Sequence, residues 1–114
     1  MKVAIFHNNE RGFAFSRWVP EAPLTLAFTG ELNEVEVTGR TEESILELIY
    51  AGTNRGSGQE WPRYMAQGLR SLSVGDVVCL YSPKKFTSYA VASMGFDAID
   101  VHDDPWFKPW TFGW

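Results

Sequence analysis

Hydrophobic and polar residues alternate along several short runs of the chain, and this pattern predicts a protein rich in β-strands. Residues 2–7 combine valine, isoleucine and phenylalanine and end at the turn-forming pair Asn8 and Asn9, as expected of a strand. Residues 13–19 carry two phenylalanines at alternate positions, although Trp18 breaks the alternation, and we expect a further strand there. Two prolines follow closely and prevent a central strand from continuing.

A pair of alternating runs follows, and together they predict a hairpin. Residues 24–29 place two leucines and a phenylalanine on one face. Residues 34–38 alternate glutamate with valine, and the glycine after them ends the run. We therefore expect a turn through residues 30–33 that pairs two strands and leaves Glu34 and Glu36 in water.

The clearest helical signal begins after Thr41, whose hydroxyl can cap the first backbone amides. Two glutamates in the first turn suit the helix dipole, and four apolar side chains then recur at helical spacing through residue 51, namely Ile45, Leu46, Leu48 and Ile49. We expect Gly52 to end this helix. A polar, glycine-rich loop over residues 53–60 separates it from a short second helix near residues 62–68, which opens on a proline.

Three apolar runs in the last third predict further strands. Residues 77–81 form a nearly continuous apolar stretch, as in a strand that is covered on both faces. A turn leads to a strand over residues 86–93, and Gly95 separates it from a short strand over residues 96–101.

These elements predict a single α+β domain over residues 1–114, with a twisted, mostly antiparallel sheet, one amphipathic helix and a short second helix. The chain has 114 residues, of which 45% are hydrophobic, and this composition favours a folded domain over disorder. No apolar run approaches the roughly 18 residues that span a bilayer, and the first apolar stretch is too short for a signal peptide. The one cysteine, Cys79, excludes an internal disulfide. We therefore expect a cytoplasmic protein that does not enter a membrane.

The net charge of −4 is unevenly distributed. Residues 31–52 carry six glutamates against one arginine, whereas residues 53–89 carry five basic side chains against two acidic ones. One alternative function is therefore nucleic-acid binding through the basic segment, with Tyr64 or Tyr81 stacking on bases and with five basic contacts, Arg55, Arg63, Arg70, Lys84 and Lys85. The overall negative charge disfavours nucleic acid as a partner. The acidic segment 31–47 could in turn imitate DNA, although an ordinary solvated face explains it.

The segment RSLSVGDVV, residues 70–78, is followed about ten residues later by YAVASMGF, residues 89–96. This pair of segments resembles small uncharacterised proteins of actinobacteria and their phages, and also the YodL-like domain of larger mobile-element proteins. The similarity covers roughly residues 54–100, and Ala90 departs from the aromatic residue that is frequent in the family. The resemblance implies a phage or mobile-element protein that acts inside a bacterial cell, and it implies no catalytic residue.

Candidate chemical groups have simpler structural explanations. Ser71, Ser73 and Asp76 could form a ligand-binding turn, but serine and aspartate beside a glycine also stabilise a turn that precedes a strand. Cys79 reads as a small buried hydrophobe. Residues 102–104 could contribute to a metal site but are more typical of a solvated turn, so we expect neither a metal nor a cofactor. No Ser-His-Asp arrangement or phosphate loop is indicated.

The end of the chain, residues 105–114, carries five aromatic side chains. They either fold back on the sheet or offer anchors to a partner or to a second copy, because buried aromatics dominate interface hot spots. We expect a non-enzymatic accessory protein that binds a host protein, with contacts from Trp106, Trp110, Trp114, Arg55 and Arg63. Nucleic-acid interaction, with Arg70, Lys84 and Lys85 as contacts, is the alternative function, and a small enzyme of unknown reaction is the third.

Overall fold

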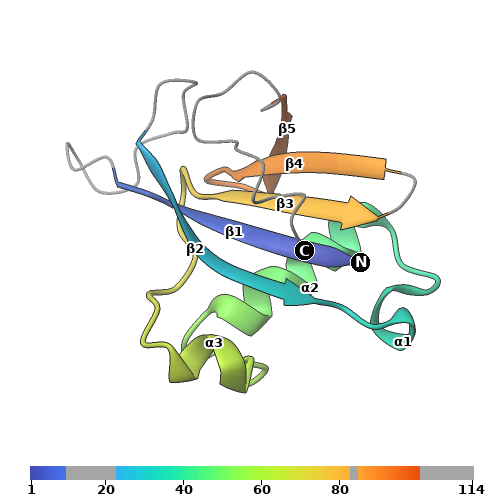
Figure 1. Ribbon diagram of the computed structural model, residues 1–114, viewed down its shortest axis with the longest axis horizontal. Coiled ribbons are helices and arrows are strands. Elements are labelled where there is room, and N and C mark those ends of the chain that lie inside the picture. Colours follow the sequence, from blue (N-terminus) through green and yellow to red (C-terminus); the bar gives the residue numbers. More distant parts are fainter. Residues whose placement is uncertain (10–22, 83–84, 101–114) are drawn as a thin grey trace.

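Five antiparallel strands form one sheet in the computed structural model, which describes residues 1–9, 23–82 and 85–100 (Figure 1). In chain order the strands are β1 (Lys2–Asn8), β2 (Leu24–Glu31), β3 (Val77–Ser82), β4 (Lys85–Val91) and β5 (Phe96–Ile99). Their order across the sheet is β2-β1-β3-β4-β5. Within the same residues three helices, α1 (Glu34–Val37), α2 (Glu42–Thr53) and α3 (Pro62–Ala66), separate β2 from β3. The predicted α+β fold with an antiparallel sheet is confirmed.

Strand β1 contributes to two hydrophobic clusters, one on each face of the sheet. Val3 and Ile5 point to the face that α2 and α3 cover, and they join the apolar side chains of both helices (Figure 1). Ala4 and Phe6 point to the other face and join a smaller cluster with Val77 and Cys79 of β3. All four β1 side chains are at most 1% exposed, as the continuous apolar run at the start of the chain requires.

Helix α2 confirms the strongest helical prediction. The Thr41 side chain accepts a hydrogen bond from the Ser44 amide at 3.1 Å, and Ile45, Leu46 and Ile49 are buried against the sheet. The helix does not end at Gly52 but continues to Thr53. A Cβ atom at position 52 would lie 2.3–2.4 Å from ring atoms of Trp61. The glycine is therefore explained by the close approach of this indole and not by a helix stop.

The strand and hairpin expected over residues 30–38 were wrong, because residues 34–37 form helix α1. The Asn33 side chain accepts a hydrogen bond from the Glu36 amide at 2.9 Å, and the Glu36 carboxylate accepts one from the Asn33 amide at 3.0 Å. This reciprocal capping box starts a helix despite the alternating valines, of which Val35 is 90% exposed. Strand β2 pairs instead with β1, and it continues to Glu31. A bulge at Ala27 shifts the register, so that Phe28 joins the cluster on the helix face whereas Leu24 packs on the other face, and the expectation that these residues share one face was wrong.

The remaining elements agree with the pattern of the sequence. The short second helix is α3, which opens on Pro62, and the three strands of the last third are β3, β4 and β5. The strand expected at residues 13–19 and the aromatic segment 105–114 lie outside the described residues. Among the helices that the structure describes, none has the length and apolar character needed to cross a membrane.

Candidate functional site

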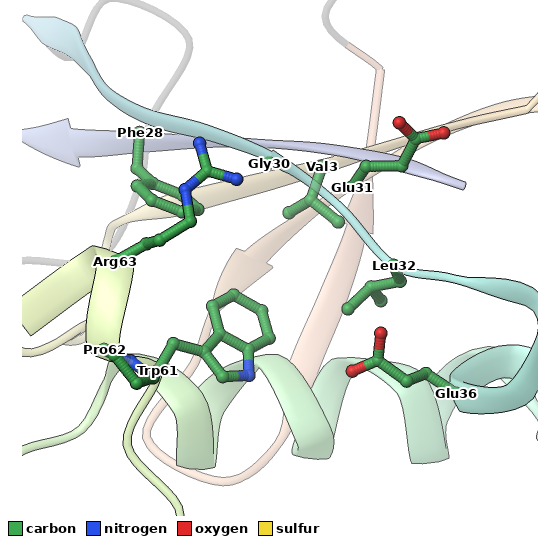
Figure 2. Close-up of a pocket in the computed structure, with 9 residues that line it drawn as sticks. All are labelled: Val3, Phe28, Gly30, Glu31, Leu32, Glu36, Trp61, Pro62 and Arg63. Carbon is green, nitrogen blue, oxygen red and sulfur yellow. The ribbon is translucent and has the colours of Figure 1, made fainter.

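A pocket of about 200 Å³ lies between strand β2 and the start of helix α3 (Figure 2). Its apolar walls come from Val3, Phe28, Leu32 and Trp61, and we call it the β2–α3 pocket. Arg63, one of the partner contacts predicted from the sequence, stands at its rim. The pocket therefore brings side chains from β1, β2 and α3 together with the chain that links β2 to α1.

Two glycines shape the aromatic walls of the β2–α3 pocket. The Trp61 indole occupies the space that a side chain at Gly52 would fill. The Phe28 ring likewise covers Gly30, where a Cβ atom would lie 2.8 Å from the ring. The two rings lie 6.2 Å apart between centroids with an interplanar angle of 33°. Phe28 is only 5% exposed, so this wall is held in place by the core.

Opposite charges stand at the two ends of this apolar space. The Arg63 guanidinium carbon lies 5.8 Å from the centroid of the Phe28 ring, a cation–π contact at one end of the pocket. Glu36 stands at the other end, beside Leu32, where the capping box with Asn33 fixes its carboxylate (Figure 2). The pocket is thus apolar in the middle, positive at the β2 side of α3 and negative at α1.

Strand β2 forms an edge of the sheet as far as the structure describes the chain. Met1 and Leu32 exchange two backbone hydrogen bonds, of 2.8 and 3.1 Å, which makes them a hydrogen-bonded antiparallel pair. Such pairs alternate with non-bonded pairs along the ladder, and Lys2↔Glu31 and Ala4↔Thr29 are therefore of the second kind. It follows that the backbone N–H and C=O groups of Thr29 and Glu31 point away from β1, directly beside the β2–α3 pocket.

Arg55 lies in a different place from Arg63, although the sequence suggested both as partner contacts. It lines a wider hollow of about 570 Å³ between the end of α2 and the turn that joins β4 to β5, and this hollow shares no lining residue with the β2–α3 pocket. Its guanidinium donates to the Leu69 carbonyl at 3.0 Å, and its amide donates to the Ser71 hydroxyl at 2.9 Å. Arg55 thus anchors a loop. The other predicted contacts, Trp106, Trp110 and Trp114, lie outside the described residues.

The turn within residues 70–78 is organised by the buried carboxylate of Asp76. One oxygen accepts from the Asn8 amide at 2.8 Å and from Arg70 at 2.9 Å; the other accepts from the Ser73 amide at 2.8 Å and from Arg70 at 2.7 Å. The Ser71 and Ser73 hydroxyls also accept hydrogen bonds from neighbouring groups of the protein. Through these contacts the Ser-Leu-Ser-Val-Gly-Asp segment connects the start of β3 to the end of β1, which explains the segment structurally.

Two of the basic side chains of the nucleic-acid alternative, Arg70 and Lys85, lie far apart and are engaged with carboxylates. Arg70 pairs with Asp76 before β3 begins, whereas Lys85 pairs with the Glu42 carboxylate beyond the end of β3. Six strand residues separate these positions, which corresponds to roughly 20 Å. Lys84 lies outside the described residues. Tyr64, one of the two rings expected to stack on bases, is fully buried.

Tyr64 of helix α3 takes part in a polar contact that the sequence did not indicate. The Tyr64 hydroxyl donates to the Arg70 carbonyl at 2.6 Å, and it therefore accepts from Nε2 of His7, 2.9 Å away. Burial is the main cause that raises the pKa of Tyr64 to about 12, and burial together with the charge of Arg70 lowers the pKa of His7. His7 and Tyr64 are 57 positions apart in the sequence, so no local spacing could have revealed their hydrogen bond.

Two candidate reactive sites have structural explanations. Cys79 is 1% exposed, and burial raises the pKa of its thiol to about 12, so it is not a thiolate nucleophile at neutral pH. The Ser88 hydroxyl donates to its sulfur at 3.3 Å. Within residues 1–9, 23–82 and 85–100, no three potential metal ligands come together. Residues 102–104, which were considered from the sequence as part of a metal site, lie outside those ranges.

Comparison of the chain with protein-family models, with curated proteins and with solved structures finds no match.

Proposed function

We propose that this chain is a non-enzymatic protein-binding module, which takes up an extended segment of a partner protein along the edge of strand β2. One observation carries the proposal: the outward-facing backbone groups of Thr29 and Glu31 lie directly beside an apolar pocket. Strand addition uses this combination, since main-chain hydrogen bonds supply affinity and a pocket selects one side chain of the added strand.

The size of the β2–α3 pocket favours a peptide over a small molecule. Sites for small molecules usually enclose about 300–1,000 Å³. At about 200 Å³, the pocket suits one apolar side chain that extends from a longer ligand. The aromatic walls, Phe28 and Trp61, provide the rigid apolar surface on which such an anchor would pack.

The resemblance to phage and mobile-element proteins supports a protein of the bacterial host as the partner. Covering the segment that the partner needs for its own contacts would then be the mechanism. The aromatic segment 105–114 remains a predicted second source of contacts. Nucleic acid receives less support, because Arg70 and Lys85 are both engaged with carboxylates of the protein itself.

A peptide library tests the proposal. Random extended peptides would be selected on the full chain, and amide hydrogen exchange measured by NMR with and without the selected peptide. We expect new protection at the Thr29 and Glu31 amides, whereas the Phe28 and Gly30 amides, which already face β1, change little. Selected peptides that leave Thr29 and Glu31 unprotected, or a library that yields no binder, would overturn the proposal.

A matched pair of variants at the end of β2 separates the backbone from the side chain. Glu31→Pro removes the outward N–H and is tolerated at an edge, whereas Glu31→Gln keeps that N–H and removes only the charge. Loss of one hydrogen bond predicts a weakening of about 2- to 12-fold for Glu31→Pro. We expect Glu31→Gln to bind within about twofold of the parent chain, and equal affinities for the two variants would contradict strand addition.

A further inference from the structure

We infer that the partner segment runs antiparallel to β2 and carries a basic, an apolar and an acidic residue at alternate positions, in that order. This inference rests on the proposed function and adds the chemistry of its ligand. It derives from the positions of Arg63 and Glu36 at opposite ends of the β2–α3 pocket (Figure 2).

Alternate residues of an added strand place their side chains on the same side as the pocket. Side chains two residues apart on a strand share a face and are about 6.6–6.8 Å apart along it. A residue whose apolar side chain enters between Phe28 and Trp61 therefore places its neighbours at positions −2 and +2 toward the two ends of the pocket. Arg63 stands at one end and Glu36 at the other, so complementary charges are acidic on the Arg63 side and basic on the Glu36 side.

The direction of β2 fixes the order of these charges. The strand passes from Phe28, under Arg63, toward Leu32, which adjoins Glu36. An antiparallel partner therefore begins at the Glu36 end and finishes at the Arg63 end. From its N-terminal end, its sequence is therefore basic, any residue, apolar, any residue, acidic. The antiparallel direction is favoured because antiparallel pairing is slightly more stable per residue than parallel pairing.

Both charged groups remain available to a ligand. Neither Arg63 nor Glu36 forms an ion pair with another residue of the described ranges. The Arg63 guanidinium lies over the Phe28 ring, and only one Glu36 oxygen is used by the Asn33 amide. Glu31 also lines the pocket, and Figure 2 shows its carboxylate directed away from Trp61.

Three synthetic peptides of equal length test the inference against the full chain. The first contains Lys-Thr-Leu-Thr-Glu, the second the reversed order Glu-Thr-Leu-Thr-Lys, and the third Ser-Thr-Leu-Thr-Ser, each within the same neutral flanks. Binding would be measured by NMR titration at low and at high salt. We expect the first peptide to bind about 3- to 30-fold more tightly than the second, with the neutral one between them, and the difference to shrink in high salt.

A charge-reversed pocket provides the matched control. Arg63→Glu should abolish or invert the preference between the first two peptides. Arg40→Glu makes the same change in net charge at an exposed residue that does not line the pocket and bonds Ser44, and it should leave the preference unchanged. Thermal unfolding of both variants confirms that each is folded.

The outcomes separate this inference from the proposed function. If all three peptides bind equally and protect the Thr29 and Glu31 amides, strand addition stands and the charge order is wrong. Tighter binding of the reversed peptide would overturn the antiparallel direction. If none of the three binds, or if binding leaves both amides unprotected, the inference and the proposed function fall together.

Discussion

Replacement of Asp76 with asparagine should strongly destabilise the protein. The carboxylate is completely buried, and each of its oxygens accepts two N–H groups. Asparagine removes the charge and turns one oxygen into an NH₂ group, which then faces two donors. The remaining oxygen can keep only one of the two backbone ties, to the Asn8 amide or to the Ser73 amide.

The expected magnitude follows from these contacts. Breaking a buried ion pair by removal of one partner costs about 3–5 kcal/mol. The Arg70 side chain is 44% exposed and can turn toward water, which lowers this cost. We therefore expect the free energy of unfolding to fall by about 2–4 kcal/mol. At about 4 °C for each kcal/mol in a domain of this size, Tm should fall by roughly 8–16 °C.

Urea denaturation and calorimetry of Asp76→Asn would test this value, with Glu47→Gln as the control. Glu47 is an exposed residue of α2, and its replacement should change the unfolding free energy by less than about 0.5 kcal/mol. If Asp76→Asn were as stable as the control, the carboxylate would not hold the turn, and the structural explanation of the Ser-Leu-Ser-Val-Gly-Asp segment would be refuted.

Three further predictions concern the core and the pocket. Gly52→Ala should destabilise the protein by about 1–3 kcal/mol in urea, because the new methyl group meets the Trp61 ring, and a stabilised variant would show that the indole moves freely. Since the pKa of Tyr64 is about 12 in the folded chain and about 10 in an unfolded one, only the unfolded state loses this proton between pH 10 and 12. Stability measured with urea should therefore fall as the pH rises through that interval, by at most about 2.7 kcal/mol from this residue, and this part should be absent in Tyr64→Phe. Cys79 should react with an aromatic disulfide reagent only after denaturation, and rapid labelling of the native protein would contradict its burial.

The elements that could be predicted from the sequence are those whose signal is local and uncontested. Thr41 and the apolar stripe after it define α2, and the apolar run over residues 24–29 locates most of β2, although the bulge at Ala27 breaks its alternation. The strand predicted over residues 34–38 was wrong because two local signals compete there. The capping box between Asn33 and Glu36 forms a helix where alternation alone indicates a strand.

The candidate site could be predicted only in part, since it depends on contacts between distant segments. Arg63 was selected for its charge, but nothing in the spacing indicates that it lies over Phe28. Strand β2 lies at an edge of the described sheet because it pairs with β1 on one side. The expected hairpin had paired it with residues 34–38 instead. The sequence places Asp76 in a turn, but one of its hydrogen-bond partners, the Asn8 amide, lies 68 positions away.

The central position of β1 has a consequence for the synthesis of the chain. One of its neighbours, β2, begins at Leu24, but the other, β3, pairs Tyr81 with Lys2. At about 5–20 residues per second, a ribosome needs roughly 4–16 s to move from one of these positions to the other. During this delay β1, with four completely or almost completely buried apolar residues in the folded chain, has a hydrogen-bonding edge without its native neighbour. Chaperone capture of the nascent chain should therefore be strongest before residue 82 emerges and should decline once β3 is available.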